Sequence, residues 1–383
     1  MGLSINEISG NSRLAILIDT QKLSVGFVVR KNQVTRRIKM KQEQYKEMCQ
    51  SLFGKTIAII YIFEGENELG YEHYEVWKTD VISSWMFAVE ELHCLPLIMD
   101  IRTFVQKAMN KSLPYIDYVI NLNNGTKILS TLGLVPSICS FLNIPCIPCD
   151  TTTIICGEHK KVSNIIAEKI GINVPKPLQP SDNTGIIRPI GLGSSLGVKR
   201  GYDDSLPNNQ FIYQEFIKGF DITTPLLYNP VTSQLEVLPA VLYSPDEANV
   251  EWFLGEKEKR LHQGYTKKIA QLSANAKKTY ISLAKEMGIF SYCRIDARLY
   301  CESKDELFEL LDSTIPLNKL YFMEINPMPT IKNNINFHTS MDALNEQCSL
   351  YACYESYKEL IPNATHTGFI LSCSMLSSLT AMH

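Results

Sequence analysis

The sequence predicts an α/β protein in which a parallel sheet is followed by antiparallel sheets. From Thr56 onward, apolar segments typical of buried strands alternate with helical patterns, as in sheets whose parallel strands are joined by helices. From about Thr184 onward, short strands are separated by turn residues, which favours antiparallel pairing. The length of 383 residues is sufficient for two or three domains.

The parallel part contains three predicted strands and one clear helix. The first strand runs into a turn after Glu64, and the third ends in polar residues after Asn121. Because ligands bind at the carboxyl ends of strands in parallel sheets, both turns are candidate substrate loops. The predicted elements are strands at 56–64, 95–101 and 115–125 and an amphipathic helix at 81–94.

The second half follows a helix that begins near His159 and a proline-rich stretch. We expect segments 186–191, 211–219 and 221–228 to form an antiparallel sheet. A helix at 273–288 precedes two strands that carry acidic residues at or near their ends, and the serine-rich end of the chain suits a packed terminal helix. The two acidic strands are expected at 292–300 and 319–329.

Composition argues against several classes of partner. The formal net charge is −3 and no basic stripe is visible, so we expect no nucleic-acid partner. No apolar run approaches roughly 18–20 residues, so we expect no membrane span. The N-terminal residues lack the charged and then apolar segments of a signal peptide. The number of cysteines, eleven, is odd, so we expect reduced thiols and a cytoplasmic location. Cys146 and Cys149 form a CxxC pair, but a zinc site would need a second close pair, and buried thiols are the favoured alternative.

Three residues on the two acidic strands carry the clearest chemistry. Asp296, Glu324 and Asn326 each lie on or just after an apolar strand, where carboxylates are rare unless they are paired or bind a metal. Two carboxylates and an amide oxygen form a hard ligand set that suits magnesium holding nucleotide phosphates. The alternative is that these residues are ordinary acids at strand edges.

Two further segments have the composition of nucleotide-binding loops. The glycine-rich stretch from Gly191 to Gly197 lets backbone N–H groups approach phosphate oxygens. The stretch from Gln214 to Asp221 could pair its backbone with a base edge, while Asp221 accepts a hydroxyl of the ribose. Taken singly, each segment is equally well explained as a turn.

Together and in this order, these segments resemble the ATP-grasp superfamily and, within it, the D-alanine–D-alanine ligase branch. The resemblance runs from about Thr56 to Asn336 and implies the ATP-grasp fold. That fold has an N-terminal parallel α/β domain, a small central α+β domain and a C-terminal α+β domain with an antiparallel sheet. The implied domains are 56–155, 156–228 and 229–383, after an extra α+β appendage at 1–55 with a helix near 42–54. The matching motifs lie at 186–200, 213–227, 292–300 and 320–329.

The resemblance also implies a role for each matched residue, with ATP and magnesium, or manganese in its place, as cofactors. Arg294 would stabilise the acyl phosphate and the tetrahedral intermediate, as a forked guanidinium can. Glu75, with Glu72 as the second choice, would bind a substrate ammonium. The phosphate contacts would be Lys160, Arg188, Gly193, Ser194 and Ser195; the adenine and ribose contacts Gln214, Glu215, Ile217 and Asp221; and the metal ligands Asp296, Glu324 and Asn326.

Several positions depart from the pattern of the branch. Arg188 replaces a lysine, Gln214 replaces a glutamate and Asp221 replaces a longer acid. The segment from Asn123 to Lys127 stands where the branch has His-Gly, and Ile335 stands where it has a serine that holds the second substrate. The resemblance therefore implies a carboxylate–amine ligase for amino-acid-like substrates other than D-alanine. The alternatives are a true D-alanine–D-alanine ligase and a nucleotide-binding protein without activity, and a homodimer is consistent with the branch.

Overall fold

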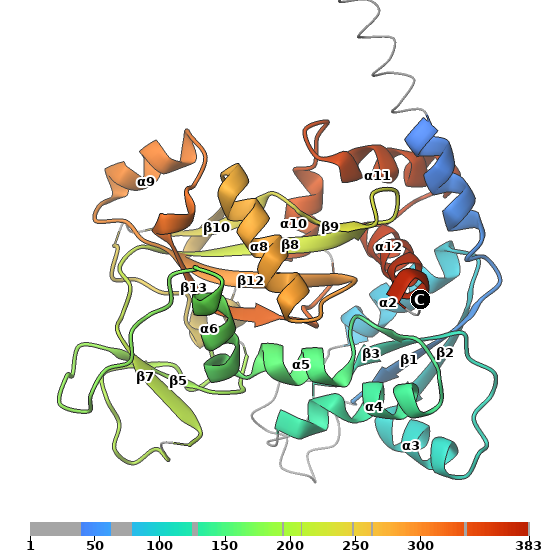
Figure 1. Ribbon diagram of the computed structural model, residues 1–383, viewed down its shortest axis with the longest axis horizontal. Helices are drawn as coiled ribbons and strands as arrows, with labels where there is room; N and C mark the ends of the chain where they lie inside the picture. The colour runs from blue at the N-terminus through green and yellow to red at the C-terminus, as the bar shows by residue number, and fades with distance from the viewer. Residues whose placement is uncertain are drawn as a thin grey trace, which may run out of the picture.

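The computed structural model describes residues 40–62, 79–124, 129–193, 195–207, 209–246, 249–261, 263–332 and 335–381. Three sheets and the helices around them form two large bodies and a smaller one (Figure 1). The parallel sheet lies at the lower right of the view, the large antiparallel sheet at the upper left and the small antiparallel sheet at the lower left. The fold is therefore the predicted mixture of one parallel and two antiparallel sheets.

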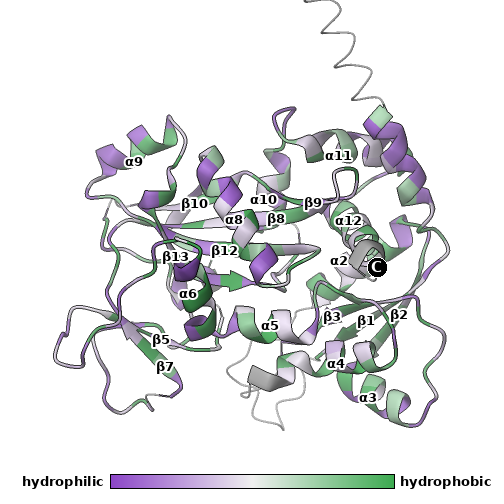
Figure 2. Ribbon diagram, in the orientation of Figure 1, coloured by the Kyte–Doolittle hydropathy of each residue, from purple (hydrophilic) through white to green (hydrophobic). Residues whose placement is uncertain are grey.

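The parallel sheet has the strand order β2-β1-β3-β4. Apolar residues fill β1 and β3 (Figure 2), because both faces of this sheet are covered by helices. One face packs against α3 and α4 and the other against α2 and α12. The elements are β1 (Thr56–Tyr61), α2 (Thr79–Glu91), β2 (Leu95–Asp100), α3 (Ile101–Met109), β3 (Tyr118–Leu122), η2 (Leu129–Gly133), α4 (Leu134–Phe141) and β4 (Cys146–Ile147).

The helix over 40–50 packs in the same core as the parallel sheet. Tyr45 and Cys49 are fully buried, and the Tyr45 hydroxyl lies 2.7 Å from Ser372 Oγ of α12. We expected this helix within an appendage at 1–55, and the structure shows its buried side packed against α12, where the Tyr45 and Phe369 rings lie 5.8 Å apart. The strand-like segments that we expected before it lie outside the described residues.

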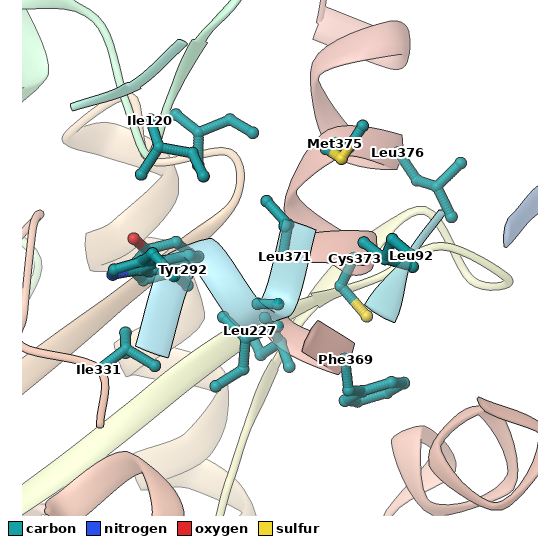
Figure 3. Close-up of a cluster of buried hydrophobic side chains, with 14 of the residues drawn as sticks. Leu92, Ile120, Leu227, Tyr292, Ile331, Phe369, Leu371, Cys373, Met375 and Leu376 are labelled. Atoms are coloured by element: carbon teal, nitrogen blue, oxygen red, sulfur yellow. The ribbon is translucent and has the colours of Figure 1, made fainter. Parts of the chain in front are cut away.

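The terminal helix α12 (His366–Ala381) joins the parallel sheet to the large antiparallel sheet. Phe369, Leu371 and Cys373 lie in one cluster with Leu227 and Tyr292 of the antiparallel sheet (Figure 3). The buried serines of α12 donate to carbonyls three or four residues earlier, as Ser374 Oγ does to Ile370 O at 2.6 Å, so the helix can be buried without unpaired hydroxyls. This confirms the packed terminal helix that we expected.

The large antiparallel sheet has the order β11-β10-β8-β12-β13, with β9 paired to β8. We expected β8 to pair with the short strands before it, but it lies between β10 and β12 in this sheet. Its continuous burial explains the placement, since a strand with a buried residue at nearly every position suits the centre of a large sheet. The strands are β8 (Phe220–Asn229), β9 (Gln234–Val237), β10 (Ala240–Pro245), β11 (Tyr265–Ala270), β12 (Tyr292–Leu299) and β13 (Leu320–Asn326).

The small sheet, of order β6-β5-β7, lies at the lower left of Figure 1, below β13 of the large sheet. Its strands are β5 (Ile186–Pro189), β6 (Lys199–Arg200) and β7 (Phe211–Gln214), and they follow α5 (Thr151–Glu158) and α6 (Lys160–Lys169). The remaining elements are α7 (Glu256–Leu261), α8 (Ala274–Glu286), α9 (Lys304–Leu311), η3 (Leu317–Lys319), α10 (Asn336–Asp342) and α11 (Ser349–Leu360).

The cysteines are all free, and each is buried or partly buried. In the described part of the chain, no three Cys, His, Asp or Glu side chains are grouped so that they could hold a metal, and this includes the surroundings of Cys146 and Cys149. Among the same residues, none of the helices combines the length and the apolar character that crossing a bilayer requires.

Candidate nucleotide and metal site

The candidate site lies on one face of β12 and β13. Side chains alternate along β12, so Arg294, Asp296 and Arg298 share a face while the residues between them enter the core. Asp296 pairs with Glu324 across the strands, and Arg294 pairs with Asn326. We expected the acid on this strand at or near its end, but Asp296 lies in the middle of β12, where pairing with β13 places it beside the second carboxylate.

A bulge adjusts the register next to this pair. Asp296 opposes Glu324 while Ala297 opposes Phe322, so Met323 is an extra residue on β13. A bulge of this kind re-aims the groups beside it and is common near functional sites. Here the carbonyl of Met323 accepts a hydrogen bond from Arg188 Nη2 at 3.2 Å. The bulge therefore supplies an acceptor that links the large sheet to the small one.

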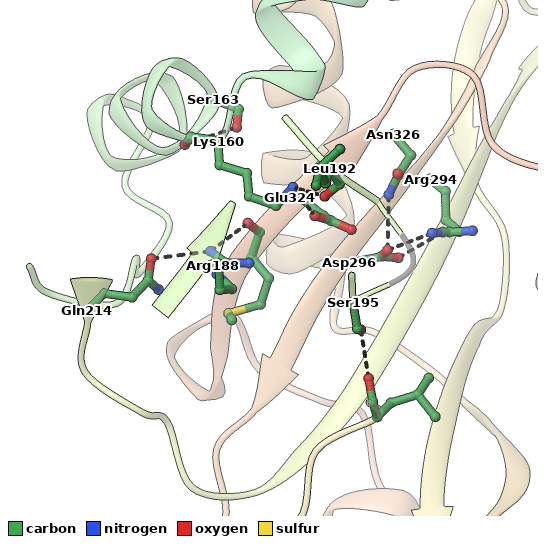
Figure 4. Close-up of polar contacts among 12 residues, drawn as sticks. Lys160, Ser163, Arg188, Leu192, Ser195, Gln214, Arg294, Asp296, Glu324 and Asn326 are labelled. Atoms are coloured by element: carbon green, nitrogen blue, oxygen red, sulfur yellow. Dashed lines mark hydrogen bonds and ion pairs between the residues drawn. The ribbon is translucent and has the colours of Figure 1, made fainter. Parts of the chain in front are cut away.

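Asp296 lies at the centre of a polar cluster (Figure 4). Arg294 donates to both of its carboxylate oxygens, from Nε at 2.9 Å and from Nη2 at 2.7 Å. Asn326 Nδ2 donates to the same carboxylate at 3.0 Å, and Thr223 of β8 donates from its hydroxyl. The bidentate arginine contact holds the carboxylate in one orientation.

Glu324 is paired with Lys160, the first residue of α6. The distance from Lys160 Nζ to Glu324 Oε2 is 3.0 Å, and Lys160 Nζ also donates to Leu192 O at 2.7 Å (Figure 4). Burial alone would raise the pKa of Glu324, but the charges of Lys160, Lys259 and Arg188 lower it to about 2. The carboxylate is therefore ionised at neutral pH in a site lined with cations.

The lowered pKa of Glu324 predicts a pH-dependent contribution to stability. The folded pKa of about 2 lies below the ordinary value of 4.5, so between these values the unfolded chain binds more protons at this group. The stabilisation is complete above pH 4.5 and is lost as the pH falls toward 2. We expect the free energy of unfolding, measured with urea, to fall more steeply below pH 4.5 in the native chain than in Glu324→Gln. Parallel curves for the two proteins would contradict the ion pair.

The donor set fits a hard divalent cation. Asp296, Glu324 and Asn326 bring carboxylate and amide oxygens together from paired strands, and these are the ligands that magnesium or manganese prefers. Glu324 is ionised in the fold, as a metal ligand must be. The three residues could therefore hold the ion that the sequence predicts.

Arg188 of β5 connects the small sheet to the large one. Its Nη2 donates to Gln214 Oε1 of β7 and to Met323 O, at 3.2 Å each. The side chain is almost fully buried, with 5% of the residue exposed. Arg188 thus lies between the two sheets in contact with Gln214, and its role in phosphate binding stays a prediction.

The glycine-rich loop is in contact with the segment before α7. Ser195 has a positive φ of 59° and donates from Oγ to Leu254 O at 2.8 Å. Gly193 lies in the same loop, beside Leu192, whose carbonyl accepts from Lys160. Ser194 lies outside the described residues. The charge of Lys259 on α7 also helps to lower the pKa of Glu324, after that of Lys160.

The connector between β7 and β8 is held by Arg298, a residue that the sequence analysis did not single out. Arg298 is 2% exposed and donates to Ile217 O at 3.1 Å, Gly219 O at 2.6 Å and Asp221 Oδ2 at 3.0 Å. It also donates to Trp252 O at 2.9 Å. Its position two residues after Asp296 on a strand is the signal that could have revealed it, because period-2 spacing places both on the same face.

Other predicted contacts in the connector have protein partners. Asp221 accepts from Leu254 N at 2.7 Å, which ties the predicted ribose acid to the segment before α7. Glu215 N donates to Lys176 O at 2.8 Å, and Glu215 Oε1 accepts from Lys176 N at 2.9 Å. Gly219 requires its residue type, since φ is 119° and a Cβ would lie 1.9 Å from Leu299 O.

The predicted substrate residues are only partly described. Glu75 and Glu72 lie outside the described residues, as do 125–128, 333 and 334. Ile335 is the N-cap of α10, and the next residue, Asn336, accepts a hydrogen bond from the buried hydroxyl of Tyr243 at 2.5 Å. Burial raises the pKa of Tyr243 on β10, and the charge of Arg294 opposes that rise. The start of α10 is therefore fixed beside the face that carries Arg294.

Comparison with known proteins places the fold. The sequence matches no protein-family model, and no curated protein matches it significantly. Solved structures do match. VanG D-Ala:D-Ser ligase from Enterococcus faecalis has a TM-score of 0.53 and 17% identity over 79% of this chain and 99% of its own. D-alanine–D-alanine ligase from Bacillus anthracis, complexed with ATP, has a TM-score of 0.55 and 15% identity over 86% of this chain and 98% of its own.

A third similar structure agrees with these two. D-alanyl-alanine synthetase A from Vibrio cholerae has a TM-score of 0.56 and 13% identity over 85% of this chain and 99% of its own. The chain thus spans nearly the whole length of each of these ligases. At such low identity the likeness establishes the fold, which is the ATP-grasp fold of the D-alanine–D-alanine ligases.

Proposed function

We propose that this chain, which has the fold of the D-alanine–D-alanine ligases, is an ATP-dependent ligase that joins a carboxylate to an amine. A carboxylate oxygen would attack the γ-phosphorus of ATP, the bond to the β-phosphate would break, and ADP would leave. The amine nitrogen would then attack the acyl carbon, phosphate would leave and the amine would lose a proton. The products are an amide, ADP and inorganic phosphate.

The observation that carries this proposal is the paired carboxylate site surrounded by cations. Asp296 and Glu324 lie opposite each other on β12 and β13, with Arg294, Lys160 and Arg188 at or near them. Magnesium held by Asp296, Glu324 and Asn326 would supply charge neutralisation for nucleotide phosphates. A site with both signs of charge in this arrangement suits a polyphosphate and a divalent cation together.

The chain's own cations have separate tasks in this scheme. Lys160 and Arg188 would bind phosphate oxygens of ATP, Lys160 after leaving Glu324 and Arg188 from its position between the sheets. Arg294 lies two residues before Asp296 on the same face of β12 and would donate to the oxyanion of the tetrahedral intermediate. The segment around Leu254, which contacts both Ser195 and Asp221, would exclude water from the acyl phosphate.

The substrates are proposed to be amino-acid-like compounds other than D-alanine. The related ligases named above act on D-alanine or D-serine by their names, but the substrate segments of this chain differ from the pattern of that branch. Ile335 offers no hydroxyl where the branch has a serine, and Asn123 begins a segment without the His-Gly pair. The free thiols suit a reducing compartment such as the cytosol, where amino acids and ATP are both available.

A screen for ADP release tests the proposal. The purified chain is incubated with ATP and magnesium and with pairs drawn from amino acids and small carboxylates. We expect one carboxylate–amine pair to stimulate ADP release well above the rate with ATP alone, with an equal amount of amide product by mass spectrometry. Stimulation by D-alanine alone would indicate a true D-alanine–D-alanine ligase. Tight ATP binding without ADP release for any pair would favour a nucleotide-binding protein without ligase activity.

A further inference from the structure

Two buried donors on the small antiparallel sheet have no acceptor within the described residues: Arg188 Nε and Gln214 Nε2. Both residues are nearly fully buried, with 5% and 3% exposed, and their side chains are joined through Arg188 Nη2 and Gln214 Oε1 (Figure 4). Proteins rarely leave buried N–H groups unpaired, because the lost hydrogen bonds to water are not replaced. Two such donors on residues that are hydrogen-bonded to each other therefore indicate a ligand that supplies acceptors.

The orientation of the Gln214 amide follows from its neighbour. A guanidinium can only donate hydrogen bonds, so the amide oxygen of Gln214 must face Arg188. The amide nitrogen is then turned to the other side, where it offers N–H groups. Gln214 can therefore offer only its Nε2 hydrogens to a group other than Arg188, whereas a glutamate in the same place could only accept hydrogen bonds.

Gln214 occupies the position where the nucleotide base is expected. It ends β7 and directly precedes the connector that Arg298 holds against the large sheet. By the resemblance described above, this position is usually a glutamate, whose carboxylate can only accept hydrogen bonds. The change from a fixed acceptor to a fixed donor alters which base edge matches the site.

A 6-oxopurine has the complementary edge. Guanine and hypoxanthine carry acceptors at N7 and O6, whereas adenine carries an acceptor at N7 and a donor at N6. Two donors on the protein can both be paired by the first edge but not by the second. Resting on the proposed nucleotide site, we propose that Arg188 Nε and Gln214 Nε2 pair with the base of a 6-oxopurine nucleoside triphosphate, GTP or ITP, which therefore binds at least as tightly as ATP. The other N–H groups of the Arg188 guanidinium stay available for a phosphate oxygen.

Direct binding measurements test this specificity without any need for ligase substrates. Dissociation constants for ATP, GTP and ITP are measured by displacement of a fluorescent nucleotide, with magnesium present, for the native chain and for Gln214→Glu. We expect GTP and ITP to bind the native chain at least as tightly as ATP. We expect Gln214→Glu, which restores an acceptor and forms an ion pair with Arg188, to shift the GTP-to-ATP preference toward ATP by about tenfold or more.

Two further variants separate this role from a general effect on folding. Gln347→Glu makes the same change at an exposed position next to α11 and should leave all three dissociation constants unchanged. Arg188→Met removes the donor that holds the amide oxygen of Gln214, so that oxygen can turn to accept from adenine, and the preference should move toward ATP. Thermal unfolding of each variant verifies that the fold is retained.

The outcomes distinguish the inference from the proposed function. Tight ATP binding with GTP and ITP at least tenfold weaker in the native chain would overturn the inference and leave the ligase proposal standing. An unchanged nucleotide preference in Gln214→Glu would also overturn it. If none of the three nucleotides binds, the nucleotide site itself is absent and both proposals fail.

Discussion

Replacing Glu324 with glutamine, or Asp296 with asparagine, is expected to reduce ADP formation by more than about 100-fold. Losing a residue that only hydrogen-bonds to a metal ligand costs up to about 100-fold, and losing a ligand itself should cost more. Each change removes one negative oxygen from the paired carboxylates of β12 and β13. A neutral amide binds magnesium more weakly than a carboxylate, and it balances Lys160 or Arg294 less well. The measurement is ADP release with the substrate pair that the screen identifies, at saturating magnesium.

A matched control separates the site from a general effect of removing a charge. Glu286 pairs with Lys169 at 3.5 Å, and both side chains are exposed. Glu286→Gln therefore breaks a lysine–glutamate pair of the same chemistry outside the site, and its activity should stay within about twofold, as the small energy of exposed pairs implies. Near-normal ADP formation in Glu324→Gln, with a native circular dichroism spectrum, would remove the metal assignment.

Replacing Arg298 with methionine is expected to destabilise the fold by about 3–5 kcal/mol, the range for breaking a buried ion pair by removing one partner. The change leaves the carbonyls of Ile217, Gly219 and Trp252 without this donor and takes the buried cation from Asp221. Methionine fills a similar volume, so the loss comes from unpaired polar groups more than from a cavity. The measurement is the free energy of unfolding in urea.

The same variant should weaken nucleotide binding, because the connector carries the predicted base and ribose contacts. Arg200 provides a matched control, since both guanidinium groups lie over the ring of Phe216, at 3.6 Å for Arg200 and 5.2 Å for Arg298. Arg200 is partly exposed and pairs with Glu251, so Arg200→Met should cost about 1 kcal/mol or less. Equal destabilisation by the two changes would mean that the ring contact, and not the buried hydrogen bonds, holds the connector.

The sequence predicted the elements of the fold well wherever periodicity was strong. Strands β1, β3, β12 and β13 lie where alternating or continuous apolar runs placed them, since burial of those runs dictates both the strand and its orientation. The placement of β8 could not be derived in the same way. A strand that is apolar throughout can be central in any sheet, and pairing over long sequence separations has no local signal.

The site was predicted as a set of residues but not as a network. Asp296, Glu324 and Asn326 are brought together because β12 and β13 are paired antiparallel. The residue types alone were enough to suggest this group of three. The bulge at Met323 and the contacts of Arg298 could not be read from the sequence, because each depends on the register of strands and on carbonyls whose positions only the fold defines. The assigned roles of the residues remain predictions.

The ion pairs of the site have a consequence for how ligands would arrive. Arg294 neutralises Asp296 and Lys160 neutralises Glu324, so basic side chains of the protein balance the two carboxylates when no ligand is bound. A polyphosphate that binds alone would draw Lys160 and Arg294 away from the two carboxylates and leave those carboxylates without a positive partner. A metal ion that binds alone would take the carboxylates and leave the two basic side chains without a negative partner. When both arrive together, each displaced charge finds a new partner. The two ligands should therefore strengthen each other's binding, and this cooperativity would be reciprocal as thermodynamic linkage requires.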